Sequence, residues 1–277
     1  GSLLAFIGVL FITPDSLLIR LTNIETWGLL FYRGFIPFVV VLFGLILFYK
    51  TNFFKALTNI GYTGIFYAIS FSVCNITFII SIQNTSVANT LIMVAMAPML
   101  SAFLGAFFLK EHPDKKTWFA IIITFLSVTF IFYDSVKLGN ILGDIFGFIT
   151  ALGLAINANL ARFAKNRDLV PAAVIGKLGT AAFAFIFVKN LNLVNTDIIV
   201  VPLMCVLCVA IPFVLVTIAP RFITAAEVNL FFLLEVILGP IWVWMVINER
   251  PSLETIIGGI VIIITIAIHS FLAIKKT

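Results

Sequence analysis

Long apolar runs constrain this chain more than any other feature of its sequence. An α-helix rises about 1.5 Å per residue, so about 20 consecutive apolar residues cross the hydrocarbon core of a bilayer. Ten segments approach or exceed that length, and the connections between them are short. They lie at residues 3–21, 27–49, 57–81, 86–109, 116–133, 142–163, 170–188, 196–218, 225–247 and 253–273. We therefore predict an all-α membrane protein with ten transmembrane helices.

The composition also indicates a membrane protein. Of the 277 residues, 62% are hydrophobic and only 10% are charged. A soluble domain has about 25% charged residues, because water must hydrate its surface. The net charge of +5 would suggest a nucleic-acid partner in a soluble protein, but here the basic residues stand at the ends of the apolar runs. That placement indicates orientation in a membrane, and we expect no nucleic-acid partner.

The Lys and Arg residues in the connections predict how the chain is oriented. Cytoplasmic connections of membrane proteins carry the excess of these residues. With both termini in the cytoplasm, eleven lie inside and four outside. The outer four are Arg20, Lys137, Lys189 and Arg250. We therefore predict a multi-pass protein of the cell inner membrane with the N-terminus and the C-terminus cytoplasmic. The first run lacks a small-residue cleavage site, so we expect no cleaved signal peptide.

An internal repeat divides the chain. Residues 86–113 resemble residues 224–251 at a constant offset of 138, with small residues opening each helix and a Glu-x-Pro sequence closing each. The offset spans five predicted helices, an odd number, so the two copies would have opposite topology. We predict two inverted five-helix repeats, residues 1–138 and 139–277, an arrangement typical of secondary transporters. Chance similarity between two apolar helices is the alternative.

Short motifs in both halves suggest a family. They are Phe31-Tyr32-Arg33, Asn84 through Asn89 leading to Ala97-Pro98, Leu109-Lys110-Glu111, Leu142-Gly143-Asp144, Leu233-Leu234-Glu235 and Asn248-Glu249. In this order and spacing the chain resembles, over nearly its whole length, the EamA-type branch of the drug/metabolite transporter superfamily. The resemblance implies ten helices and a central cavity between the halves. It implies transport of small organic solutes such as amino acids, nucleosides, amines, nucleotide sugars or drugs. Lys177 departs from the pattern of that family.

Five ionisable residues fall inside the predicted spans: Asp15, Arg33, Lys177, Glu227 and Glu235. Each costs at least about 2.5–3.5 kcal/mol at membrane depth, so each should face a cavity or a partner. Asp15 follows Pro14, which kinks a helix and frees a backbone carbonyl. Asp15 could therefore be a cation or proton site, or it could pair with Arg33 on the next helix.

Lys177 should either pair with a carboxylate, for which we favour Glu235, or bind an anionic group of a substrate. The alternative is that Lys177 lies near enough to the helix end to extend to the interface. Glu227 stands eight residues before Glu235, about 12 Å along the axis. The two carboxylates therefore cannot share one ligand atom, and Asn229 lies between them.

The uncharged polar residues Tyr67, Asn75, Asn89 and Asn157 complete the candidate substrate-binding set, together with Trp242. Asn157 and Asn159 differ by two positions, so they should face different sides of their helix. Trp242 would belong either to an interfacial aromatic belt or to an aromatic wall that binds a quaternary amine.

We predict a secondary transporter that moves a small polar or charged organic metabolite, amino acid or amine-like, across the inner membrane by alternating access. The first alternative is a broad-specificity drug or metabolite exporter, which the 30 Phe residues would suit. The second is an intramembrane enzyme, for which we find no catalytic cluster. We expect no cofactor and no metal. The expected partners are a small-molecule substrate and the lipid bilayer, with coupling to protons or to a counter-substrate, in a monomer or a homodimer.

Overall fold

The computed structural model describes the chain except residues 51–55, 57, 111–113, 165–166, 219–221, 223–224 and 275–277. For residues 134–138, 217–218, 225–230 and 273 it describes the backbone alone. Within these limits the chain is helical and contains no strand. The elements are α1 (Ser2–Ile12), α2 (Asp15–Leu21), α3 (Thr26–Tyr49), α5 (Gly61–Asn84), α6 (Val87–Ala95), α7 (Ala97–Phe108), α8 (Lys115–Leu138), α9 (Ile141–Phe163), α10 (Val170–Phe187), α11 (Asp197–Met204), the π-helix η2 (Cys205–Ala210), α12 (Ile211–Ile218), α13 (Ala225–Ile247) and α14 (Leu253–Ile274).

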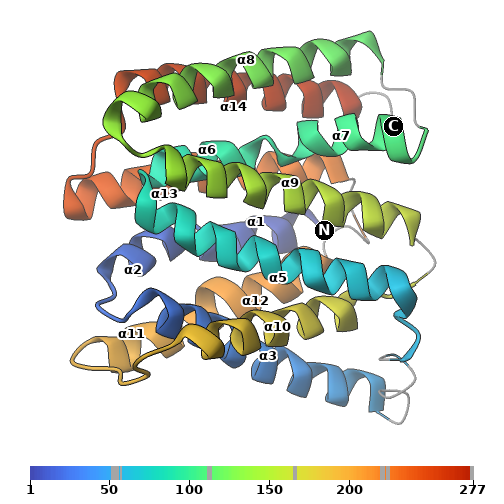
Figure 1. Ribbon diagram of the computed structural model, residues 1–277. Helices are drawn as coiled ribbons and strands as arrows, with labels where there is room; N and C mark the ends of the chain where they lie inside the picture. The colour runs from blue at the N-terminus through green and yellow to red at the C-terminus, as the bar shows by residue number, and fades with distance from the viewer. Residues whose placement is uncertain are drawn as a thin grey trace.

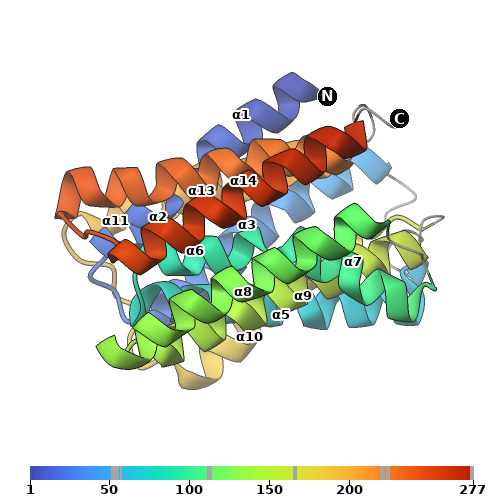
Figure 2. The same ribbon diagram turned by 90° about the horizontal axis from the view of Figure 1, so that it is seen from above.

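The helices form a bundle whose long axes run in one general direction (Figures 1 and 2). Nine segments among the described residues are long and apolar enough to cross a membrane, and a shorter apolar helix, Phe231–Ile247, lies in the ninth predicted run. The prediction of an all-α, multi-pass membrane protein is therefore confirmed. Both termini lie at one end of the bundle (Figure 1). We call this the termini end, and the opposite end, where α2 finishes, the Arg20 end.

Three of the spans are interrupted within the described part of the chain. The first breaks at Thr13-Pro14, because proline lacks an N–H and its ring obstructs the preceding turn, so α2 begins at Asp15 inside the membrane. The fourth breaks at Met96, two residues before Pro98. The eighth contains η2, a π-helix of six residues. Interrupted helices expose backbone groups, and transporters commonly build their binding sites at such breaks.

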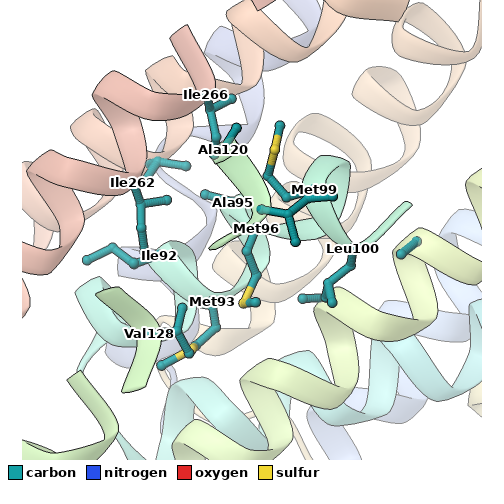
Figure 3. Close-up of a cluster of buried hydrophobic side chains, with 14 of the residues drawn as sticks. Ile92, Met93, Ala95, Met96, Met99, Leu100, Ala120, Val128, Ile262 and Ile266 are labelled. Carbon is teal, nitrogen blue, oxygen red and sulfur yellow. The ribbon is translucent and has the colours of Figure 1, made fainter. Parts of the chain in front are cut away.

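Two pairs of helices stand at opposite sides of the bundle. The α8–α14 pair lies on one side and the α3–α10 pair on the other, with α1, α5, α6, α9 and α13 between them (Figures 1 and 2). Beside α8 and α14 a buried apolar cluster joins these helices to α6 and α7 (Figure 3). Its largest members with almost no exposure are Met93, Met96, Met99, Ile131 and Ile262. The ionisable side chains of the interior lie outside this cluster.

Glycines bring α3, α5 and α10 into direct backbone contact. A Cβ on Gly34 of α3 would lie 2.7 Å from the Lys177 carbonyl oxygen on α10. A Cβ on Gly176 would lie 2.8 Å from the Ala68 carbonyl oxygen on α5, and one on Gly179 would lie 2.6 Å from a Ser72 oxygen. Because Gly34 follows Arg33 and Gly176 precedes Lys177, these contacts hold two basic side chains near one another.

Candidate substrate site

Asp15 and Arg33 form a buried ion pair where the first span breaks. Two Arg33 guanidinium nitrogens donate to the two Asp15 carboxylate oxygens at 2.6 and 2.8 Å. Asp15 is only 3% exposed and Arg33 only 8%. The pairing that we considered for Asp15 is thus confirmed. Two parallel hydrogen bonds between ions satisfy both groups and fix the orientation of α2 against α3.

Lys177 is buried and meets a neutral group. Its ammonium donates to Asn75 Oδ1 at 2.5 Å and lies 5.4 Å from the centre of the Phe71 ring. The Asn75 amide in turn donates to the Phe71 carbonyl oxygen at 2.6 Å, which orients Asn75 Oδ1 toward the lysine. Among the described residues no carboxylate lies within ion-pair distance of Lys177. The prediction that Lys177 pairs with Glu235 is wrong, because the glycine contacts of α10 direct it to α5.

Glu235 lies at the middle of α13 and is half-buried. It forms no hydrogen bond or ion pair with any residue that the structure describes. Glu235 and Lys177 each interact electrostatically with both members of the Asp15–Arg33 pair. Counted from the Arg20 end at 1.5 Å per residue, these four side chains lie about 9–18 Å deep. All four therefore lie inside the membrane-spanning part of the bundle, and we call them the central charges.

The side chains of Glu227 and Asn229 lie outside the described part of the structure.

Tyr67 and Asn157 lie nearer the termini end than the central charges. Tyr67 stacks on Phe71 with the ring centres 6.1 Å apart, and its hydroxyl has no hydrogen-bond partner among the described residues. The Asn157 amide makes a long contact with Cys74 Sγ at 4.0 Å, and its buried Oδ1 has no partner there either. Asn159 bonds instead to Ser101 of α7, so the two asparagines face different sides of α9, as predicted.

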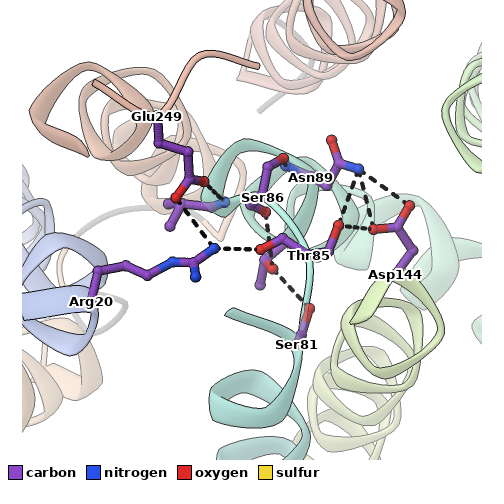
Figure 4. Close-up of polar contacts among 9 residues, drawn as sticks. Arg20, Ser81, Thr85, Ser86, Asn89, Asp144 and Glu249 are labelled. Carbon is purple, nitrogen blue, oxygen red and sulfur yellow. Dashed lines mark hydrogen bonds and ion pairs between the residues drawn. The ribbon is translucent and has the colours of Figure 1, made fainter. Parts of the chain in front are cut away.

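Asn89 belongs to a separate polar network at the Arg20 end (Figure 4). Its amide donates to the Asp144 carboxylate of α9 at 3.2 and 3.3 Å, and its Oδ1 accepts from Thr255 of α14 at 2.6 Å. Thr85 donates to Asp144 at 2.6 Å. Asp144 has no exposed surface. These bonds fix Asn89 and separate it from the central charges.

The same network contains an ion pair between the halves of the chain. Arg20 lies 3.2 Å from Glu249 and donates to the Thr85 carbonyl oxygen at 2.6 Å, while Glu249 accepts from the Val87 backbone N–H at 2.8 Å (Figure 4). Glu249 thus caps the first turn of α6. Our candidate set missed Arg20, Thr85, Asp144 and Glu249. The motifs containing Asp144 and Glu249 were visible in the sequence, but nothing in them indicated that they belong to one network.

Trp242 connects α13 to the break in the first span. Its indole N–H donates to Thr13 Oγ1 at 3.2 Å, and Thr13 also donates to the Leu10 carbonyl oxygen. Trp242 is 37% exposed. Its hydrogen bond places it at the break, on a residue two positions before Asp15. Among the described residues no group of His, Cys, Asp or Glu has the arrangement of a metal site.

Among the described residues, interrupted helices and charged side chains lie within a bundle of apolar spans. This arrangement is typical of multi-pass membrane transporters. The sequence model of the EamA-like transporter family matches residues 1–133 and 141–271. The chain therefore belongs to that family, which is part of the drug/metabolite transporter superfamily. The family resemblance drawn from the short motifs is confirmed.

Individual relatives agree with the family. The chain is 24% identical over 203 residues to "Uncharacterized transporter YdfC" of Bacillus subtilis (strain 168). That match covers 70% of this chain but only 65% of the relative, less than two thirds of its length. A crystal structure with 16% sequence identity superposes with a TM-score of 0.68 over 98% of this chain and 97% of that one, which shows a shared fold. The family and the named relative point to a transporter rather than an enzyme.

Proposed function

We propose that this chain is a secondary transporter that moves a small polar or charged organic metabolite, amino acid or amine-like, across the inner membrane by alternating access. The observation that supports the proposal is which of the central charges are paired and which are not. Asp15 and Arg33 satisfy one another, whereas Lys177 and Glu235 have no partner of opposite charge among the described residues. An ionised group at this depth is costly without a partner. A charged substrate supplies that partner.

Helix packing supports two related halves, residues 1–138 and 139–277. The offset of 138 residues relates α5 to the α11–η2–α12 span and α9 to the α1–α2 span. The observed contact of α5 with α9 then corresponds to the observed contact of α12 with α1. The same offset relates α3 to α10 and α8 to α14. The observed contact within each of these pairs therefore joins the two equivalent helices. This packing supports ten spans in two repeats of inverted topology.

The central charges have no counterparts in the other half. The positions 138 residues from Asp15, Arg33, Lys177 and Glu235 are Gly153, Pro171, Val39 and Ala97. None of these can be ionised. Two repeats that share a packing pattern but differ in their charges support a single substrate site between them, rather than one in each half.

The network at the Arg20 end supports alternating access. Arg20 and Thr85 belong to the first half, and Glu249 belongs to the second, so the Arg20–Glu249 ion pair holds the halves together at this end. The excess of Lys and Arg at the opposite end supports the assignment of the Arg20 end to the outer side. A substrate that enters or leaves on the outer side requires this ion pair to open.

Counterflow in proteoliposomes tests the proposal. Vesicles containing the purified protein are loaded with one compound from a panel of amino acids and amines, and uptake of the labelled compound is followed. We expect saturable uptake that Lys177→Met and Glu235→Gln both reduce, whereas Lys189→Met, an exposed control, does not. If both central variants transport as well as the wild type, the proposed site is wrong. Repeating the assay with a pH gradient tests coupling to protons.

A further inference from the structure

The Lys177 ammonium has hydrogen-bonding capacity that no described residue uses. An ammonium carries three donors, and Asn75 accepts one of them. The Phe71 ring lies against the same ammonium at 5.4 Å, an attraction that holds the cation without neutralising it. Arg33 differs, because the Asp15 carboxylate engages it through two bonds. Lys177 is thus held in position while its charge stays unpaired by any described carboxylate.

The side chains around Lys177 on α5 are only partly buried. Tyr67, Phe71 and Asn75 recur every four residues and so form one stripe of the helix. All three are half-buried, although α10 and the η2–α12 segment pack beside them. Lys177 itself is only 6% exposed, so its charge does not reach the interface. A ligand on this stripe would meet the ammonium at its unused donors.

We propose that Lys177 and Asn75 form an anion subsite that binds the carboxylate of the substrate. This inference rests on the proposed transport function and narrows its substrate class. The central charges comprise two cations and two anions when ionised, so a substrate without net charge preserves their balance. A zwitterion whose carboxylate meets Lys177 fulfils that condition. A simple amine leaves Lys177 unpaired, and a phosphate dianion adds excess negative charge.

Matched pairs of compounds test this subsite. Each pair consists of an amino acid and the amine left after its carboxylate is removed, for example phenylalanine with phenethylamine and lysine with cadaverine. We expect the wild type to transport at least one amino acid and to reject its amine. Lys177→Met should raise the KM for that amino acid about 10- to 100-fold, as expected for loss of a charge-assisted hydrogen bond. Lys189→Met, the same change at an exposed position, should leave the KM unchanged.

Asn75→Asp provides a second test that does not remove the lysine. The new carboxylate would pair with Lys177 and compete with the carboxylate of the substrate. We expect Asn75→Asp to raise the KM at least about tenfold while Tm stays equal or rises, because the buried cation gains a partner. Asn84→Asp is the matched control, since the Asn84 amide donates to the Ile80 carbonyl oxygen four residues earlier, as Asn75 does to Phe71.

The outcomes separate this inference from the proposed function. Transport of amines as fast as their parent amino acids, undiminished by Lys177→Met, would overturn the anion subsite and leave the transporter standing. Selective transport of amino acids with an unchanged KM in both Lys177→Met and Asn75→Asp would also overturn it. Counterflow of no amino acid or amine by the folded wild type would overturn the proposed function, and the subsite with it.

Discussion

Replacing Asp15 with Asn tests whether the buried ion pair stabilises the interrupted first span. The pair consists of two short hydrogen bonds between residues that are 3% and 8% exposed. Removing one partner of such a pair leaves an uncompensated charge and costs about 3–5 kcal/mol. At about 2–4 °C for each kcal/mol, Asp15→Asn should lower the Tm of the purified protein in detergent by roughly 6–20 °C. Tryptophan fluorescence during heating measures this change.

Two further variants make this prediction specific. Adding Arg33→Met to Asp15→Asn removes both charges and should recover most of the lost stability, because apolar replacement of a buried ion pair is often neutral. Glu254→Gln changes a carboxylate in the first turn of α14 and should cost less than about 1 kcal/mol. If Asp15→Asn lowers Tm no more than Glu254→Gln does, or if the double variant is no more stable than the single one, Arg33 does not depend on Asp15.

Three other substitutions have expected outcomes. Glu249→Gln weakens the ion pair with Arg20 and should open the outer end more often. A maleimide added from the outer side should then label the buried native cysteines faster. An unchanged rate of labelling would contradict a closed outer end. Asp144→Ala removes an acceptor of buried donors and should cost about 1–3 kcal/mol in thermal unfolding; a smaller loss than about 0.5 kcal/mol would contradict a structural role. Gly34→Ala places a Cβ 2.6 Å from a backbone nitrogen of α10 and should lower stability by about 1–3 kcal/mol. Gly44→Ala, with nothing within 4 Å, should not, and equal Tm values for these two variants would refute the close contact.

The sequence predicted the membrane fold because that information is local. Each span is a continuous apolar run, and no contact between distant residues is needed to recognise it. The Asp15–Arg33 pair could also be predicted, because pairing lowers the cost of placing two opposite charges of consecutive helices inside a membrane. Glycine contacts determine the partner of Lys177, and these depend on how α10 approaches α5. Nothing local distinguishes Asn75 from Glu235 as that partner.

The network at the Arg20 end could not be predicted from the sequence, for a similar reason. Thr85 and Glu249 stand at the ends of separate spans, 164 residues apart, and only the folded bundle brings them together. Each residue taken alone resembles an ordinary residue in a polar connection. Asn89 was predicted as a substrate ligand because it is polar inside an apolar run. Its contacts with Asp144 and Thr255 instead favour a structural role, which no periodicity could have indicated.

The four central charges differ in role according to the half of the chain that contains them. Asp15 and Arg33 both belong to the first half, satisfy one another and hold the broken span against α3. Lys177 and Glu235 both belong to the second half, on α10 and α13, and neither has an ion-pair partner among the described residues. Since Trp242 of α13 bonds to Thr13 at the break, a shift of α13 on binding would act directly on the interrupted span of the first half.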